Sequence, residues 1–306
     1  MSRLNQPILV LDVGNTNTVV GVLKDPSVLP TAKAHGFAPI WRISTHPLLT
    51  SDELKSKLKW FLRDEDLSLG DFGAVVVSSV VPAMTEILRF AFGDHPFAEY
   101  DKAHPALIIL NHESPFSFRI DTASPSQVGT DRLVNAEAAV HLYGAPCIII
   151  DSGTATTVCA VAGDSKAASY RGGAIMPGLE LSLESLARRA AQLFSVELSA
   201  PESVIGDTTT NAIRSGLMHG YASMIDGMVE KFKVELGSTP TLAQNHSTSN
   251  AAANATQPVA NTNQYRVIGT GGISQRLRPL TKSIDTFDAD LTLKGMAFLY
   301  ESLCKR

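Results

Sequence analysis

The chain has 306 residues and a formal net charge of −4 at pH 7, and its basic residues form no cluster. No run approaches ~18 consecutive apolar residues and no signal peptide begins the chain, so we expect a cytoplasmic protein with neither a nucleic-acid nor a membrane partner. The length gives room for two domains, and the spacing of Cys147, Cys159 and Cys304 indicates free thiols rather than a metal site.

The first element in chain order covers residues 8–23, ILVLDVGNTNTVVGVL. Two apolar runs flank the turn Gly14-Asn15-Thr16-Asn17, which predicts two strands joined by a tight turn. Asp12 stands where the first strand ends. The backbone N–H groups of such a turn can cradle phosphate oxygens, and the carboxylate can hold the accompanying Mg²⁺. A hairpin whose Asp and Asn serve turn chemistry alone explains this stretch equally well.

Strands and helices alternate along the rest of the first half. Residues 24–40 are rich in Pro and Ala and predict a loop. The patterns then predict a strand over 41–45, a helix from Ser51, a strand over 74–81 ended by Pro82, a helix over 84–92 and a strand over 106–110. This alternation is typical of an α/β sheet.

The second half continues the alternation. We expect a helix after Gly129-Thr130-Asp131-Arg132, strands over 147–151 and 171–176, and an amphipathic helix carrying Leu179, Leu183, Leu186, Ala190 and Leu193. A turn and a long helix are predicted over 206–233, a strand over 265–268 and a last helix over 293–303. Residues 238–264 contain no charged side chain and almost nothing large and apolar, which predicts a flexible polar insertion.

The strand–turn–strand pattern occurs twice. Residues 150–161, IDSGTATTVCAV, match 11–22 at a constant offset of 139 residues, and both copies contain Asp-x-Gly, at Asp12 and Asp151. This agreement is better explained by duplication than by chance. Two such loops facing each other would hold a nucleotide between two similar domains, as in the actin-like phosphotransferases. By analogy we expect two actin-like α/β domains of the ribonuclease-H-like type, over 1–120 and 121–306, with a nucleotide cleft between them.

Other motifs are less specific. The chain has no Gly-x-x-x-x-Gly-Lys-Ser/Thr loop, no dinucleotide fingerprint, no serine nucleophile elbow and no histidine ligand spacing. Gly269 to Gly272 suit a close approach of backbone to adenine or ribose, or form an ordinary strand–helix turn. Asp131-Arg132 offers a base for an alcohol and a guanidinium for an anionic substrate. Asp131 is otherwise a residue favoured by the helix dipole.

Taken together, these motifs resemble those of the type III pantothenate kinases. The resembling pieces span most of the chain in the order of that family. They are LDVGNTNTVVG at 11–21, WRIST at 41–45, SSVVP at 78–82, VGTDRLVNA at 128–136, IDSGTATT at 150–157, GGAIMPG at 172–178, IGDTTTNAIRSG at 205–216, GTGGIS at 269–274 and LTLKGM at 291–296. The resemblance implies transfer of the γ-phosphoryl group of ATP to pantothenate, giving 4′-phosphopantothenate in the first step of coenzyme A biosynthesis.

The resemblance also implies roles for individual residues. Asp131 would be the general base, and Gly129, Thr130 and Arg132 would bind pantothenate. Asp151 would ligate a monovalent cation, K⁺ or NH₄⁺, and Thr154 would contact ATP. Asp12, near Mg²⁺, would begin the first phosphate loop, which continues through Val13, Gly14, Asn15, Thr16, Asn17, Thr18 and Val19.

The family is dimeric, so the resemblance implies a homodimer in which Thr209 reaches pantothenate bound to the partner subunit. The helix that follows Thr209 carries an apolar stripe, which the resemblance places at the interface. Many members have a tyrosine near the substrate, seven residues before Gly129, where this chain has Thr122. Two alternatives stay open: a non-catalytic, nucleotide-binding transcription accessory protein of the same fold, and a kinase for another small hydroxy-acid.

Overall fold

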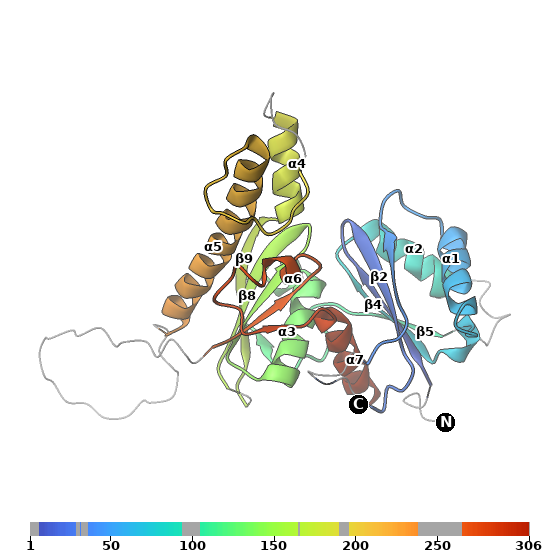
Figure 1. The fold of residues 1–306 in the computed structure, drawn as a ribbon. Coiled ribbons are helices and arrows are strands. Elements are labelled where there is room, and N and C mark those ends of the chain that lie inside the picture. The colour runs from blue at the N-terminus through green and yellow to red at the C-terminus, as the bar shows by residue number, and fades with distance from the viewer. Residues whose placement is uncertain are drawn as a thin grey trace, which may run out of the picture. The chain divides into compact units, whose positions relative to one another are not determined.

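The structure is a computed structural model that describes residues 6–28, 31, 36–93, 105–164, 166–189, 196–237 and 265–305. The described chain forms two compact units (Figure 1). Unit 1 contains the residues up to Tyr143, Tyr170–Gly172 and the residues from Asp288 on, and unit 2 contains Gly144–Ser169 and Gly173–Phe287. This grouping differs from the boundary predicted at residue 120. The reason is that the helices α3 (Thr130–Tyr143) and α7 (Leu291–Cys304) pack on each other and on strands of unit 1.

Unit 1 is built on a five-stranded sheet. The predicted hairpin is present, because β1 and β2 pair antiparallel from Ile8↔Leu23 to Val13↔Thr18. β4 lies parallel to β1 on its other side, and the strand order is β3-β2-β1-β4-β5. The strands are β1 (Ile8–Val13), β2 (Asn17–Leu23), β3 (Ile40–Ser44), β4 (Ala74–Ser79) and β5 (Ala106–Ile109).

Side-chain alternation along β1 and β4 divides the core of unit 1 between the two faces of the sheet. Odd-numbered residues such as Leu9 and Val75 pack with α1 (Ser51–Arg63) and α2 (Pro82–Phe92). Even-numbered residues such as Ile8 and Val76 pack with α3 and α7. Figure 1 shows the first helix pair and α7 on opposite sides of this sheet. α1 begins at Ser51, as predicted, and Thr50 caps it through a capping box with Glu53.

A second sheet of six strands, most of which belong to unit 2, repeats this arrangement. Its order is β11-β10-β7-β8-β9-β6, so β7, β8, β9, β10 and β11 hold the same relative places as β1 to β5. β7 is antiparallel to β8 and parallel to β10, as β1 is to β2 and β4. The predicted duplication and actin-like α/β fold class are therefore confirmed. The strands are β6 (Arg119–Ile120), β7 (Cys147–Ser152), β8 (Ala155–Ala162), β9 (Ser169–Pro177), β10 (Arg266–Thr270) and β11 (Thr286–Phe287).

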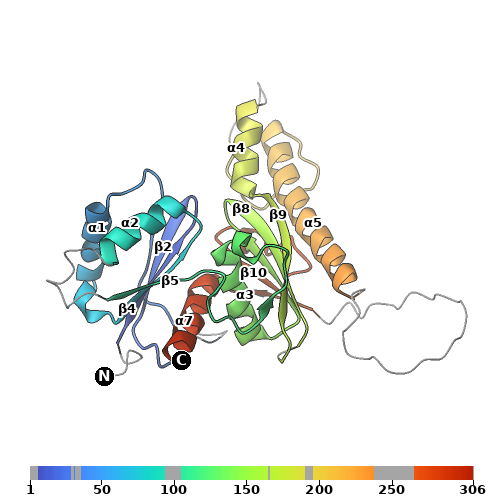
Figure 2. The ribbon, with the colours of Figure 1, turned by 180° about the vertical axis from the view of Figure 1, so that it is seen from behind.

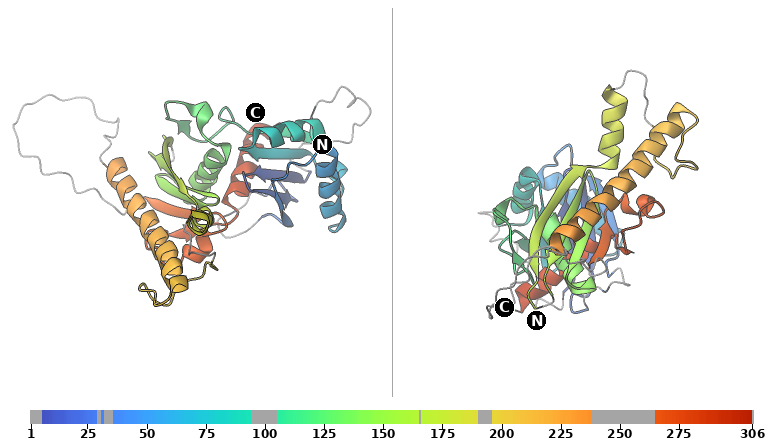
Figure 3. Two further views of the ribbon diagram at one scale, coloured as in Figure 1. Left: turned by 90° about the horizontal axis from the view of Figure 1, so that it is seen from above. Right: turned by 90° about the vertical axis from the view of Figure 1, so that its left-hand side faces the viewer.

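Three helices belong to unit 2: α4 (Leu179–Arg189), α5 (Thr209–Gly237) and the short α6 (Ser274–Leu277). Figures 2 and 3 show α5 crossing the sheet, with α4 beside its N-terminal part. Ala190 and Leu193, predicted for the amphipathic helix, and the insertion 238–264 lie outside the described residues.

The apolar stripe of α5 does not face a partner in the way the resemblance implied. Ile213, Met218, Tyr221 and Ile225 are buried in the core of unit 2, and Leu217 and Met224 pack against that core. The placement of this stripe at a subunit interface is therefore wrong. An apolar stripe indicates burial, and here the sheet of the same unit provides it.

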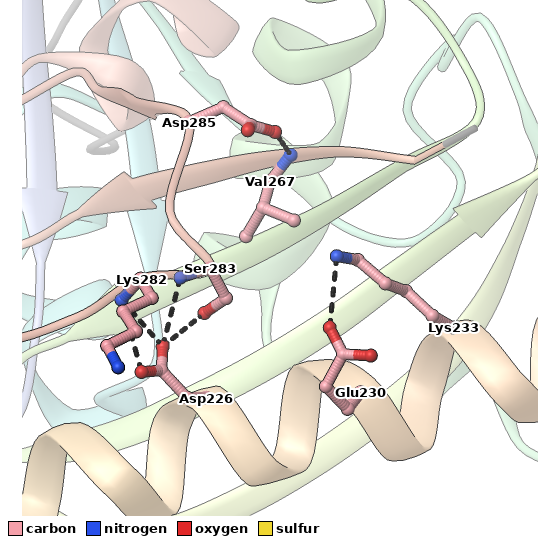
Figure 4. A network of polar contacts seen from close by, with 7 residues as sticks. All are labelled: Asp226, Glu230, Lys233, Val267, Lys282, Ser283 and Asp285. Atoms are coloured by element: carbon pink, nitrogen blue, oxygen red, sulfur yellow. Dashed lines mark hydrogen bonds and ion pairs between the residues drawn. The ribbon is translucent and has the colours of Figure 1, made fainter. Parts of the chain in front are cut away.

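A polar network fixes α5 to the segment between α6 and β11 (Figure 4). The Asp226 carboxylate accepts hydrogen bonds from the backbone N–H groups of Lys282 and Ser283, each at 3.1 Å, and from the Ser283 hydroxyl at 2.6 Å. Asp285 in turn accepts a 2.8 Å hydrogen bond from the backbone N–H of Val267 in β10. The long helix and the edge of the sheet are therefore joined by side chain–backbone bonds as well as by apolar packing.

Two expectations from composition can be compared with the structure. Cys147 and Cys159 are buried and free, and Cys304 is free and partly exposed. None of the described helices combines the length and the apolar character that a membrane crossing requires.

Candidate functional site

The first predicted phosphate turn is held in shape by β3. The backbone N–H of Gly14 donates to the Asn17 carbonyl at 3.0 Å, which closes the turn. Thr45, just after β3, donates its backbone N–H to Thr16 at 2.8 Å and its hydroxyl to Gly14 at 2.8 Å, and its hydroxyl lies 3.0 Å from that of Thr18. Thr45 and Thr18 are buried, whereas Asn15, Thr16 and Asn17 are exposed.

Asp12 lies in β1 immediately before this turn and is partly exposed. Its strand neighbours are Val19 on β2 and Ser78 on β4. Alternation places Asp12 on the face of the sheet that α3 and α7 cover, while Val13 turns into the opposite core. A partly exposed carboxylate at a strand end, beside a turn with exposed residues, has the chemistry to meet a metal ion carried by phosphates.

The predicted substrate residues lie at the beginning of α3, in the same unit. Gly129 is needed here, because a Cβ at this position would lie 2.5 Å from Oδ1 of Asp131 and 3.5 Å from Cγ1 of Val80. Val80 follows β4 and donates its backbone N–H to the Val13 carbonyl at 3.1 Å. The contacts from Val13 through Val80 to Gly129 therefore bring the phosphate turn and the beginning of α3 to one edge of the sheet.

Asp131 is partly buried at this edge, as are Thr130 and Arg132. Its Oδ1 accepts a 2.8 Å hydrogen bond from the backbone N–H of Arg132. Burial raises the pKa of the Asp131 carboxyl above its ordinary value, and the Arg132 N–H and guanidinium oppose this effect without cancelling it. A carboxylate with a raised pKa is a stronger base than an exposed aspartate, which suits proton abstraction from an alcohol.

The second predicted loop is constrained from three sides within unit 2. Gly271 has φ +86°, and a Cβ there would lie 2.6 Å from Oδ1 of Asp151. The backbone N–H of Gly178 donates to the Thr154 carbonyl at 3.0 Å. Tyr221 of α5 donates its hydroxyl to Thr156 and also lies 2.9 Å from the Pro177 carbonyl oxygen. Asp151 is partly exposed and Thr154 is exposed, so both can meet a ligand.

These contacts explain one of the glycines at 269–272, Gly271. Gly271 turns the chain where β10 ends, directly beside the end of β7, since Thr270 pairs with Asp151 and Ile273 N–H donates to the Ser152 carbonyl at 3.3 Å. Only a residue without a side chain fits there. Close packing against Asp151 therefore accounts for Gly271.

Thr209 and Thr122 are the two remaining predicted positions. Thr209 is exposed at the first residue of α5. The hydroxyl oxygen of Thr122 is buried and has no hydrogen-bond partner in the described parts of the chain. Its methyl group lies 3.6 Å from where a Cβ on Gly172 would stand. A nearby hollow of about 380 Å³ is formed by the segment between β5 and α3, and neither Asp12 nor Asp131 lines it. Its lining residues are His112, Glu113, Ser114, Pro115, Phe116, Phe118, Ile120 and Pro125.

The oxygen ligands at these two edges suit a metal ion that binds together with a nucleotide better than an ion that is bound by protein side chains alone. Among the described residues, no group of three or more His, Cys, Asp or Glu side chains could hold a metal. Mg²⁺ ordinarily binds through one or two carboxylates together with phosphates and water, which Asp12 and the adjacent turn can accommodate. The buried hydroxyl of Ser78, the neighbour of Asp12 on β4, has no hydrogen-bond partner among the described residues and also fits a hydrated ion at this edge.

Reasoning from the sequence missed Thr45, Ser78 and Tyr221 as residues of these two edges. Thr45 and Ser78 lie inside the motifs WRIST and SSVVP, which were noted without a role. Nothing in the sequence indicated that Tyr221 holds the second loop, because its partners are 65 and 44 residues away along the chain.

Comparison with known proteins agrees with these motifs. The family model described as type III pantothenate kinase matches residues 8–231. The type III pantothenate kinase of Bacillus cytotoxicus is 35% identical over 294 residues, which cover 96% of this chain and 95% of that protein. The crystal structure of a conserved putative Baf family transcriptional activator from Campylobacter jejuni has the same fold, with a TM-score of 0.51, 16% identity and coverage of 97% of this chain and 100% of that one. The match to the family model and the relationship to the Bacillus protein establish that this chain belongs to the type III pantothenate kinase family.

Proposed function

We propose that this kinase transfers the γ-phosphoryl group of ATP to the primary hydroxyl of pantothenate, with Asp131 as the general base. Membership of the family supports the substrates. The observation that carries the assignment of the base is the position of Asp131, at the beginning of α3, beside the Asp12 turn and with its pKa raised by burial. Both features are those that a base for an alcohol requires.

In this mechanism the chain mainly positions reactants and offsets negative charge. The first phosphate loop, Asp12 to Val19, would hold phosphate oxygens at its exposed residues Asn15, Thr16 and Asn17. Asp12 would hold the hydrated divalent ion that accompanies ATP. Mg²⁺ would neutralise charge that develops on the phosphates. Gly129, Thr130 and Arg132 bind pantothenate so that its hydroxyl faces Asp131. Asp131 accepts the hydroxyl proton as the oxygen attacks the γ-phosphorus and ADP leaves.

Thr154 and Asp151 have two further roles in this proposal. Thr154 donates its hydroxyl to ATP phosphates, since its side chain is exposed on a turn fixed by Gly178 and Gly271. Asp151 would ligate a monovalent cation, K⁺ or NH₄⁺. A carboxylate oxygen is a suitable ligand for such a hard ion, and an ion there would offset phosphate charge during transfer.

We also propose a homodimer in which Thr209 contacts pantothenate in the partner subunit. The support is one face of α5 that lacks large side chains. A Cβ added at Gly216, Gly220 or Gly227 would meet nothing within 4 Å, and Ala212 and Ser223 are also exposed. Short side chains let two helices approach closely. Nearby, Val204 and Ile205 are 67% and 86% exposed, which is unusual for large apolar residues unless a partner covers them.

A coupled assay of ADP release tests the function directly, with purified protein, Mg²⁺, K⁺ and either pantothenate or a panel of other hydroxy-acids. Pantothenate should support turnover, and Asp131→Asn should lower kcat on the order of 10²–10⁴-fold while nucleotide binding stays near normal. Asp52→Asn is the matched control, because Asp52 is also the second residue of a helix but is exposed. Near-normal kcat in the Asp131 variant would remove that residue as the base. Turnover with another hydroxy-acid but not with pantothenate would overturn the substrate.

A further inference from the structure

Ser78 lies at the end of β4 and has a hydroxyl group without a partner. Its side chain is completely buried, and its oxygen accepts and donates no hydrogen bond within the part of the chain that the structure describes. Buried hydroxyl groups normally have a partner, because desolvation without a hydrogen bond is unfavourable. Such a group at the edge of a binding site therefore points to a partner that arrives with the ligand.

The position of Ser78 next to Asp12 indicates which ligand could bind its hydroxyl group. The parallel pairing of β1 and β4 sets Ser78 directly opposite Asp12. Both are even-numbered residues, so both side chains project from the face of the sheet that α3 covers. The exposed turn residues Asn15 to Asn17 can reach phosphate oxygens from outside. Ser78 is instead enclosed beside the carboxylate.

The adjacent serine provides a contrast within the same motif. Ser79 projects to the opposite face, where its hydroxyl accepts hydrogen bonds from the Val81 N–H at 3.2 Å and from the Thr85 hydroxyl at 2.8 Å. Ser79 therefore fixes the beginning of α2. The two serines are neighbours in sequence, but only Ser78 has an unused hydroxyl.

We infer that Ser78 is a positioning residue for the metal-bound nucleotide, whose hydroxyl binds a water molecule in the shell of the divalent ion that Asp12 orients. Mg²⁺ keeps several water ligands when it is bound by one carboxylate and phosphates, so such water is available next to Asp12. A hydroxyl group both donates and accepts, and it can hold this water in one orientation. The inference rests on the proposed use of ATP.

Calorimetric titration with a non-hydrolysable ATP analogue tests the role of Ser78 without relying on activity. Wild type, Ser78→Ala and Ser79→Ala are compared in Mg²⁺ and in EDTA, and the Tm of each is measured without nucleotide. Ser78→Ala should bind the analogue about 3- to 10-fold more weakly in Mg²⁺ and equally well in EDTA. Its Tm should be unchanged or higher, because it removes an unsatisfied buried group. Ser79→Ala should have a lower Tm and unchanged affinity in both conditions.

Each other outcome overturns the inference in a distinguishable way. Equal affinity of Ser78→Ala and wild type in Mg²⁺ would mean that the hydroxyl does not contact the metal-bound nucleotide. An equal loss in Mg²⁺ and EDTA would mean that it contacts the nucleotide itself. A marked fall in the Tm of Ser78→Ala would assign it a structural role. Failure of the wild type to bind the analogue would overturn the proposed function together with this inference.

Discussion

At Asp131, burial and hydrogen bonding act on the carboxyl group in opposite directions. Burial disfavours the charged form, while the Arg132 N–H and guanidinium favour it, and the pKa is raised on balance. The protein therefore ionises this carboxyl at a cost in stability. A raised pKa is expected of a catalytic base, which has to bind a proton in each reaction cycle.

This cost predicts a pH-dependent gain in stability for Asp131→Asn. Because the folded-state pKa lies above the unfolded value, the wild type loses stability as pH rises through the folded pKa. The asparagine variant keeps an oxygen for the Arg132 N–H and carries no charge. We expect its Tm to exceed that of wild type at pH 7 and the two values to converge below about pH 4. A Tm of the variant that is lower at pH 7 and equal at low pH would contradict the direction of this shift.

Asp151 gives a second prediction at the scale of one residue. Activity should require K⁺ or NH₄⁺, and Asp151→Asn should lose that response, because an amide offers a weaker ligand to a hard cation. Initial rates measured with increasing KCl at constant ionic strength test this, with NaCl as the balancing salt. Full activity of the wild type in sodium-only buffer would argue against a cation site at Asp151.

Among the elements, the ends of β7 and β10 show how neighbouring strands shape a loop. β10 ends beside Asp151, and Gly271 makes the turn possible by adopting φ +86° without a side chain. Similarly, β4 ends beside β1, and Val80 packs on Gly129. Strand ends that meet at one edge thus bring together residues from distant parts of the chain.

Gly271→Ala should separate backbone strain from crowding of Asp151. Gly144→Ala is the matched control, because Gly144 has φ +84° but open space around its Cβ position. The control should cost about 1–2 kcal/mol in free energy of unfolding, from the left-handed backbone alone. Gly271→Ala should cost more and should also raise the K⁺ concentration needed for half-maximal activity. Denaturant unfolding and K⁺ titration of both variants measure this, and equal K⁺ responses would exclude crowding of Asp151.

For the whole molecule, the open question is whether one subunit suffices for activity. The apolar side of α5 is used within unit 2, whereas its small-residue side and the adjacent Val204 and Ile205 remain exposed. A second copy of the chain would bury these surfaces and bring Thr209 to a neighbouring site. The proposed homodimer therefore predicts that activity depends on residues from both subunits.

Mixing two inactive variants, Asp131→Asn and Thr209→Arg, should restore part of the activity. A mixed dimer would have one site with both residues intact and one site with both replaced. The rate of the mixture should therefore exceed that of either variant alone. If subunits exchange at random, about half the dimers are mixed and half of the sites in these dimers are intact, so the rate should reach at most about one quarter of the wild-type rate. Native mass spectrometry of the same sample must confirm exchange. Confirmed exchange without any gain in rate would confine the site to single subunits.

Local structure and the kind of chemistry could be predicted from the amino-acid sequence. β-branched runs around Gly14 and Gly153 predicted both hairpins, and the repeated Asp-x-Gly motif predicted the duplicated fold, because strand alternation and turn chemistry are local properties. The family motifs also predicted the substrates and led to the proposal that Asp131 is the base.

Which residues contact one another depends on the three-dimensional packing of the chain. Strand register set Ser78 opposite Asp12, and packing placed Thr45 under the first turn and Tyr221 beside the second. Packing also buried the apolar stripe of α5 in the core of unit 2 and grouped α3 and α7 with unit 1. Hydrophobic periodicity predicts that a face is buried, but the surface that covers it depends on contacts between segments far apart in the chain.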